Sequence, residues 1–242
     1  MQKSLLIFIL SFSVILFTAC RQVGIRGHGK EGTELRNMPQ FTSVEIDAPV
    51  DATIDITSGN QGSVELSGYQ NLISYIKTEV KEGVLHIYTT DDIYFSTNKN
   101  VQAHIITGSL SSISISGASD AIVHGNATGP EFSIEVSGAA KVIVDTLNVQ
   151  NFSSDLSGVA KIEVKSGSVQ TAKYQVSGDG TIKAFNLQSK DVTADISGLG
   201  KVEINAQEKL STSISGAGTV RYKGHPSLSS ETSGSGTVSD AN

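Results

Sequence analysis

Apolar and polar residues alternate along most of the chain from Phe41 onward. The first runs carry apolar side chains at every second position, as in Val44, Ile46 and Ala48. A period of two predicts β-strands that bury one face, and the glycines between the runs predict turns. We therefore expect residues 41–107 to form irregular opening β coils or a cap, and we favour coils because a solenoid needs an end of different character.

From residue 108 to 242 a longer period is superimposed on this alternation, because Ser-Gly pairs recur at steps of 21, 20, 20, 20, 18 and 18 residues. The pairs are Ser116 and Gly117, Ser137 and Gly138, Ser157 and Gly158, Ser177 and Gly178, Ser197 and Gly198, Ser215 and Gly216, and Ser233 and Gly234. A fixed period of this size predicts a solenoid, and it is too short for a propeller blade of about 40 residues. The predicted fold is all-β, a single-stranded β-helix with coils of about 20 residues and an irregular N-terminal β section.

Each Ser-Gly pair is followed by one free residue and then by a small residue, which is the pattern of a tight corner. Glycine permits the bend, and we expect the Ser hydroxyls to donate hydrogen bonds from coil to coil. A row of catalytic serines is the less favoured interpretation, because no coil supplies a base. The Ser-Gly residues are therefore interpreted as structural.

Charged residues form two further regular positions around the corner. Six residues after the corner Ser, four consecutive coils carry charges of alternating sign, which we interpret as a device that fixes the register: Glu163, Lys183, Glu203 and Arg221. Two residues before the Ser, the chain is mildly acidic. A calcium site there is the less favoured alternative, since the Gly-Gly-x-Gly-x-Asp pattern of calcium-binding β-rolls is missing.

The first residues have the pattern of a lipoprotein signal peptide, which we assign to residues 1–19. Lys3 precedes an apolar run that is too short to span a membrane, and small residues lead to Cys20. Cys20 is the only cysteine, and its position predicts acylation by a fatty acid such as palmitate. Phe17 stands where Leu is commoner, so a soluble exported protein is the alternative. Residues 20–40 are expected to form a flexible tether.

These features predict a cell-envelope protein that is anchored by lipid in the outer membrane, on a face that the sequence does not specify. The net charge of −6 and the isoelectric point of about 5.3 argue against nucleic acid as a partner. The expected contacts are the membrane through the lipid, a protein or glycan partner, and further copies of the chain. No cofactor is expected.

Aromatic and acidic residues concentrate in one predicted loop, between residues 88 and 100. We consider it the best candidate for contact with a partner, through Tyr88, Asp91, Asp92, Tyr94 and Phe95. The alternative is a loop that folds back over the cap.

The remaining chemistry-bearing residues do not form an obvious site. The five histidines are scattered, so neither a metal site nor a catalytic set is predicted: His28, His86, His104, His124 and His225. Lys141, Lys161 and Lys201 form a row that Thr181 interrupts, and we interpret it as a solvated strand face.

The chain resembles the head GIN domain family of auto-transporter adhesins, which is common in the envelopes of Bacteroidota. The resemblance extends from Arg36 to Thr237, and residues 41–242 are interpreted as one such domain. Its segments are FTSVEIDAP, ISYIKTEVKEGVLHIYT, the repeated [IV]-S-G-x-[AG] corners, VRYKGHPSL and the last SGSGTV. The family likeness implies a single-stranded β-helix and brings no catalytic residues.

The sequence therefore favours a non-catalytic envelope lipoprotein, an adhesin or a structural interaction module. The alternative is a carbohydrate-binding or carbohydrate-active β-helix protein. A third hypothesis is a solenoid that assembles end to end, because the last Ser-Gly unit has few features of a polar cap.

Overall fold

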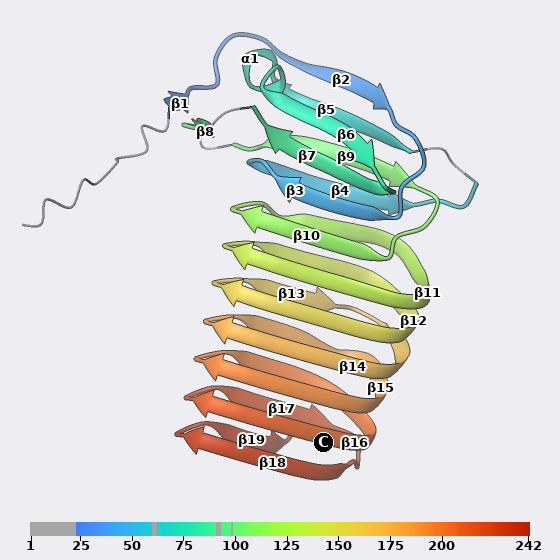
Figure 1. Cartoon of the computed structure of the whole chain (residues 1–242), viewed down its shortest axis with the longest axis vertical. Helices are drawn as coiled ribbons and strands as arrows, with labels where there is room; N and C mark the ends of the chain where they lie inside the picture. Colours follow the sequence, from blue (N-terminus) through green and yellow to red (C-terminus); the bar gives the residue numbers. More distant parts are fainter. Residues whose placement is uncertain (1–22, 60–61, 91–92, 98) are drawn as a thin grey trace, which may run out of the picture.

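The computed structural model describes residues 23–59, 62–90, 93–97 and 99–242, and about three quarters of them are in β-strands. One 17-stranded sheet winds into a tall stack of coils, as Figure 1 shows. The stack confirms the prediction of an all-β, single-stranded β-helix. Among the described residues, no helix is long and apolar enough to cross a membrane.

The Ser-Gly solenoid consists of parallel strands, each paired with the strand one coil away. Its strands are β10 (Ser112–Gly117), β11 (Ala121–Gly138), β12 (Lys141–Gly158), β13 (Lys161–Val164), β14 (Gly167–Gly178), β15 (Thr181–Gly198), β16 (Lys201–Gly216), β17 (Thr219–Lys223), β18 (Ser227–Gly234) and β19 (Thr237–Asp240). The register sets Ser157 beside Ser137 and Ser177, so the corners of successive coils coincide. The sequence period is thus the length of one coil.

The core is a continuous column of apolar side chains inside the coils. The coils contribute buried side chains after a corner, at the middle bend and before the next corner. In the coil of β12 these are Val142, Val144, Leu147, Val149, Phe152 and Leu156. Phe132 and Phe152 stack with ring centroids 6.4 Å apart, and Tyr174 meets Phe152 edge-on at 5.7 Å. Each large buried side chain contributes about 1.5–3 kcal/mol relative to its exposed state.

The N-terminal section contains both opening coils and a cap, the two arrangements that the sequence left open. Strands β3 (Ser43–Asp47) and β4 (Val50–Ile56) form a coil on top of β10 and β11. Strands β7 (Val84–Thr89) and β9 (Val101–Thr107) stack on that coil in parallel. Strands β5 (Ser63–Tyr69) and β6 (Ile76–Lys81) pair antiparallel with β9 and β7, beside the short helix α1 (Gln70–Ile73), and they close this end.

The predicted flexible tether is wrong for part of residues 20–40. Strand β2 (Glu31–Asn37) pairs antiparallel with β5, and β1 (Val23–Ile25) pairs with β8 (Ile93–Phe95). The β2 side chains are mostly exposed, so the strand carries no clear apolar alternation and depends on its backbone ladder. The predicted signal peptide and Cys20 lie outside the described residues.

Candidate functional site

The corners of the solenoid are built from backbone. From the second corner onward, the amide of the residue after the corner Gly donates to the Gly carbonyl of the preceding coil, as in Asp179 N to Gly158 O at 3.0 Å. Gly178 has φ 125°, and a Cβ there would lie 2.7 Å from the Gly158 oxygen. Glycine is therefore required both by its dihedral angle and by the closeness of the next coil.

The corner serines do not have the expected role. All seven are exposed, and within the described residues none of their hydroxyls forms a hydrogen bond from coil to coil. The period of two explains this: Ser177 follows the buried Val176, so its side chain points outward. The predicted hydroxyl ladder is wrong, and the carbonyls of the corner Gly residues connect the corners instead.

The small position two residues after the corner Gly is buried against the core in all coils except the last, where Gly236 is half-buried. A Cβ on Gly200 would meet the side chain of Val176 at 2.6 Å. Ser119 is the polar exception, and its hydroxyl donates to Ala48 O at 2.8 Å and accepts from Val50 N at 3.3 Å. This buried serine fastens the first Ser-Gly coil to the coil of β3 and β4.

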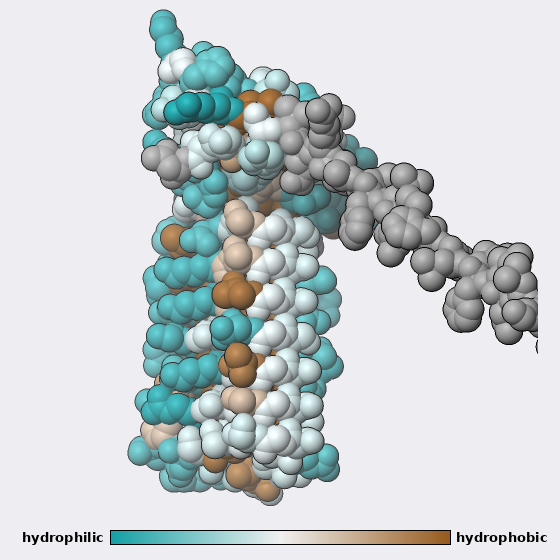
Figure 2. Space-filling model, turned by 90° about the vertical axis from the view of Figure 1, so that its left-hand side faces the viewer, coloured by the Kyte–Doolittle hydropathy of each residue, from teal (hydrophilic) through white to brown (hydrophobic). Residues whose placement is uncertain are grey.

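The free residues at the corner tips form an exposed line along the molecule, which we call the corner ridge. Its members are Ala118, Ala139, Val159, Asp179, Leu199, Ala217 and Ser235. Val159 is 66% exposed and Leu199 is 62% exposed. Figure 2 shows a narrow line of brown and pale residues that descends the stack beside a hydrophilic band. The corner ridge is thus a rigid, mainly apolar edge.

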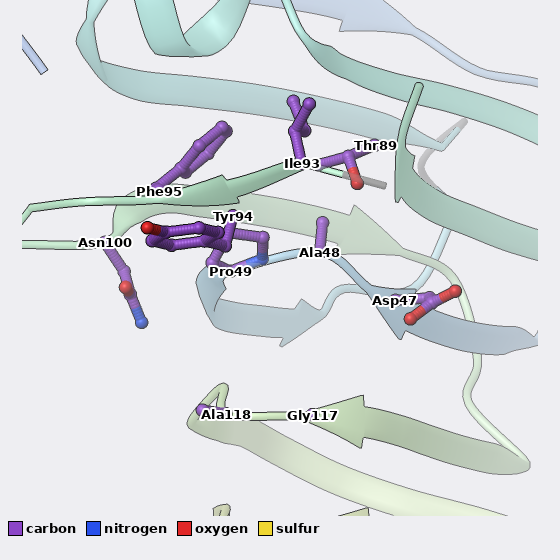
Figure 3. Close-up of a pocket in the computed structure, with 10 residues that line it drawn as sticks. All are labelled: Asp47, Ala48, Pro49, Thr89, Ile93, Tyr94, Phe95, Asn100, Gly117 and Ala118. Carbon is purple, nitrogen blue, oxygen red and sulfur yellow. The ribbon is translucent and has the colours of Figure 1, made fainter. Parts of the chain in front are cut away.

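A pocket of about 870 Å³ lies at the upper end of the ridge, where the solenoid meets the N-terminal section. We call it the junction pocket. Gly117 and Ala118 line its lower side in Figure 3, and the turn through Pro49 lies above them. Strand β8 contributes Tyr94 to the lining. Tyr94 is 49% exposed, and its ring lies beside Pro49 in Figure 3. The pocket therefore offers an aromatic face next to polar groups.

Polar side chains at the pocket are held by neighbours. Asn100 donates through its amide nitrogen to Asp51 Oδ1 at 3.0 Å. Asp51 also accepts from the side-chain amide of Gln102 and from the backbone of Asp120, at 3.2 Å in both cases. Asp47 and Thr89 add a carboxylate and a hydroxyl to the lining. Such a set can bind and orient a ligand by hydrogen bonds.

The predicted contact loop is only partly assembled as a site. Tyr94 and Phe95 both line the pocket, although Phe95 also packs against the core, and Tyr88 lies half-buried in β7. Asp91 and Asp92 lie outside the described residues. Residues 93–95 form strand β8 and are not part of one continuous loop, so Tyr94 is exposed while Ile93 and Phe95 on either side are half-buried.

The alternating charges lie in register on the strands that follow the corner: Glu163, Lys183, Glu203 and Arg221 stack in this order. Arg221 contacts Glu203 across coils at 3.0 Å, and Lys161 and Lys201 contact Glu163 and Glu203 along their own strands, at 3.0 and 3.5 Å. The pKa of Glu163 is lowered by the hydrogen bond from Lys161 and further by Lys183 and Lys141. The surroundings of this carboxylate are therefore positive.

Three of the histidines that appear scattered in the sequence each lie beside a carboxylate of the neighbouring strand. His104 Nε2 lies 2.6 Å from Asp55, His124 Nδ1 lies 2.8 Å from Asp145, and His86 Nδ1 lies 3.1 Å from Glu45. The strands of the first pair, β4 and β9, are about fifty residues apart in the sequence, and those of the last pair, β3 and β7, are about forty apart, so the sequence alone could not pair them. In the described part of the chain, no three His, Cys, Asp or Glu side chains are grouped as a metal site.

The sequence matches the family of the putative auto-transporter adhesin, head GIN domain, over residues 40–226, so the chain belongs to this family. It is similar to a putative adhesin from Bacteroides fragilis, with 25% identity, 90% of this chain and all (100%) of that chain covered, and a TM-score of 0.82. A putative adhesin from Parabacteroides distasonis shares the fold at 22% identity and a TM-score of 0.70, over 90% of this chain and 100% of the other.

A third structure, of a putative lipid binding protein from Parabacteroides distasonis, has the same fold at 21% identity and a TM-score of 0.68. The match covers 90% of this chain and 100% of that chain. No curated protein matches the chain.

Proposed function

We propose that this member of the head GIN family is a non-catalytic adhesion module of the cell envelope, which contacts a protein partner through the corner ridge and the junction pocket. The exposure of Val159 and Leu199 on a rigid edge is the observation that carries the proposal. Exposed apolar side chains that are aligned and rimmed by polar residues are typical of contact sites between proteins. The family description of the chain supports the same function.

Tyr94 gives the proposed interface an aromatic anchor at one end. A half-exposed tyrosine next to a concave surface is typical of the few residues that supply most of the binding energy. The ridge below it is held by the backbone hydrogen bonds of the corners, so little ordering entropy is lost on binding.

The contact surface is tested by adhesion of cells that carry the full chain to surfaces coated with fibronectin, laminin or collagen. We expect retention on at least one coat, and a loss of about tenfold for Tyr94→Ala combined with Val159→Ser and Leu199→Ser. The matched control is Leu35→Ser with Leu228→Ser, which removes two other exposed leucines. Equal loss in the control, or no retention of the unchanged chain on any coat, would refute the proposal.

We also propose that Cys20 carries the lipid that holds the protein in the outer membrane, and that residues 1–19 are the signal peptide. Supporting this, the apolar run and the small residues before Cys20 have the pattern of a lipoprotein, and adhesins act at the cell envelope. Metabolic labelling with palmitate is expected to mark the chain and to fail for Cys20→Ser, which should leave the membrane fraction. A Cys20→Ser protein that keeps its label excludes this anchor.

A second candidate function is carbohydrate binding or a carbohydrate-active site at the junction pocket. It is favoured by one observation, the exposed Tyr94 ring in the same pocket as Asn100 and Asp47, because sugars combine an apolar face with hydroxyl groups. A glycan array with a hydrolysis screen distinguishes it. Binding of a neutral glycan that Tyr94→Ala removes favours this function, and turnover of a polysaccharide would make the protein an enzyme.

A further inference from the structure

A second surface, separate from the junction pocket, concentrates positive charge on an acidic protein. We call it the lysine face, and it consists of the outward positions that follow the corners between residues 141 and 223. It carries seven cations, Lys141, Lys161, Lys165, Lys183, Lys201, Arg221 and Lys223, and three carboxylates, Asp145, Glu163 and Glu203. The face therefore has a surplus of four positive charges, although the whole chain has a net charge of −6.

The cations lie in columns that run along the stack. Lys141, Lys161, Thr181 and Lys201 occupy successive coils in register, at a spacing of about 4.8 Å per coil. The sequence shows only this interrupted row. Lys183 lies on the same strand as Thr181, two residues further on, in the neighbouring column. The coil that has Thr181 in place of a lysine therefore still carries a cation on this face.

The internal ion pairs leave part of this charge unmatched. Glu203 is shared by Arg221 and Lys201, and Glu163 is bound by Lys161. Within the described residues, neither Lys141 nor Lys183 has a carboxylate within ion-pair distance. The lowered pKa of Glu163 reports the combined effect of Lys161, Lys183 and Lys141 on a group among them. An anion that approaches the face would be attracted in the same way.

A groove of about 470 Å³ lies between the corner ridge and the lysine face. Val159 and Asp179 of the ridge line one side, and Lys161, Thr181 and Lys183 line the other. In Figure 2 the hydrophilic band lies directly beside the line of the ridge. The groove thus combines the apolar side chain of Val159, the carboxylate of Asp179, the hydroxyl of Thr181 and two lysines from consecutive coils, so its cations outnumber its acid groups by one.

We propose that this groove binds a linear anionic polysaccharide, which lies along the stack and pairs its acid groups with the cations of the lysine face. A polymer with regularly spaced acid groups matches columns that repeat once per coil. Thr181 can hydrogen-bond sugar hydroxyls, and Val159 can contact the apolar face of a sugar ring. The inference goes beyond the proposed function, because adhesion depends on the ridge tips and Tyr94 and would stand if this groove bound nothing.

Two other polyanions fit the surface less well. Phe185 is the aromatic ring of the lysine face, and Lys223 and Arg221 lie over it at 5.0 and 5.6 Å from the centroid, so it offers no open platform for a nucleic-acid base. A membrane surface would press on the ridge, where Asp179 places a carboxylate among the apolar tips. Both are kept as outcomes of the test.

The test measures binding of polygalacturonate to the full chain by isothermal titration at low ionic strength, with the fully methyl-esterified polymer as the neutral control. We expect binding of the acidic polymer alone, weakened by added salt. Lys161→Gln with Lys183→Gln and Lys201→Gln should lower the affinity about tenfold, since several exposed charge pairs are lost together. The matched control is Lys173→Gln with Lys190→Gln and Lys209→Gln, which removes the same charge from exposed positions elsewhere and should change the affinity less than about twofold.

The proposal is overturned if the unchanged chain does not bind polygalacturonate, or if both triple variants lose affinity equally. It is also overturned if single-stranded DNA or vesicles of anionic phospholipid bind more tightly than the polysaccharide at equal ionic strength. All substituted lysines are solvent-accessible, and thermal unfolding of each variant shows whether the fold is retained.

Discussion

At the scale of single residues, the corner glycines fix the geometry of the solenoid. The carbonyl of every corner glycine except the last, Gly234, accepts a hydrogen bond from the next coil, and every one except the first, Gly117, lies too close to the preceding corner for a side chain. The serine before each glycine points to solvent. The two members of the repeated pair, which look equivalent in the sequence, therefore have opposite roles.

We expect Gly178→Ala to lower the free energy of unfolding by about 1–3 kcal/mol, because a side chain at φ 125° is strained and meets the Gly158 carbonyl. Ser177→Ala is the matched control at the adjacent residue and should change stability by less than about 0.5 kcal/mol. Urea unfolding followed by circular dichroism measures both. A larger effect for Ser177→Ala than for Gly178→Ala would contradict the assignment of roles.

Tyr174 is a polar residue in the aromatic column of the core. Its hydroxyl is buried and has no hydrogen-bond partner among the described residues, and burial raises the pKa of the phenol. We expect Tyr174→Phe to leave the free energy of unfolding unchanged or to raise it by up to about 1 kcal/mol. Tyr222→Phe, at a half-buried position, is the control. A loss above about 1 kcal/mol in urea unfolding would indicate a hydrogen bond to that hydroxyl.

At the scale of strands, ion pairs connect neighbouring coils on the outside. Asp145 of β12 accepts a hydrogen bond from Lys165 Nζ at 2.8 Å and lies 2.8 Å from His124 Nδ1 of β11. Its pKa is lowered, first by the hydrogen bond with Lys165 and then by that with His124. One carboxylate thus ties three successive coils together.

Asp145→Asn should destabilise the protein at neutral pH by less than about 1 kcal/mol, since exposed ion pairs contribute little. A lowered pKa in the folded state gives stability that is present above the ordinary value of 3.8 and lost as the pH falls through the folded value. The difference between Asp145→Asn and the unchanged chain should therefore vanish in acid. Urea unfolding from pH 7 down into acid below 3.8 measures it, and a difference that does not shrink over this range would contradict the ion pair. Asp155→Asn is the control.

The strands of the repeat were predictable because every coil contains the same local pattern of alternating apolar and polar residues and a Ser-Gly corner. A period of two and the Ser-Gly step place Val142 inside and Glu163 outside without knowledge of any distant contact. The site depends on distant contacts. Tyr94 reaches the ridge because β8 lies against the turn at Pro49, and Lys183 completes the lysine face only through the parallel register. Local periodicity cannot show either arrangement, nor could it identify the exposed strand β2.

At the scale of the whole molecule, the solenoid behaves as a linear array. Each coil pairs with the coils above and below, and the register from Lys141 to Lys161 to Thr181 advances by one coil at each step. Stability in such an array is approximately a sum over coils and their interfaces. The number of coils is therefore adjustable without a new fold.

We expect deletion of residues 161–180, one complete coil, to give a folded protein. Ala160 would then precede Thr181, which occupies the same register as Lys161. Deletion of residues 161–179 should unfold the protein, because a shift by one residue moves every inward side chain to the outside. Circular dichroism and thermal unfolding distinguish the two. Equal stability of the two deletions would contradict the array.

The pairing of β8 also has a mechanical consequence. In the described part of the chain, β8 belongs to a two-stranded sheet with β1 and not to the large sheet. Val23 pairs with Ile93, and Gly24 pairs with Tyr94. Tension on the chain before Val23 would therefore load the strand that carries Tyr94 before it loads the coils. A pull from the N-terminal side would therefore deform the junction pocket before it deforms the stacked coils.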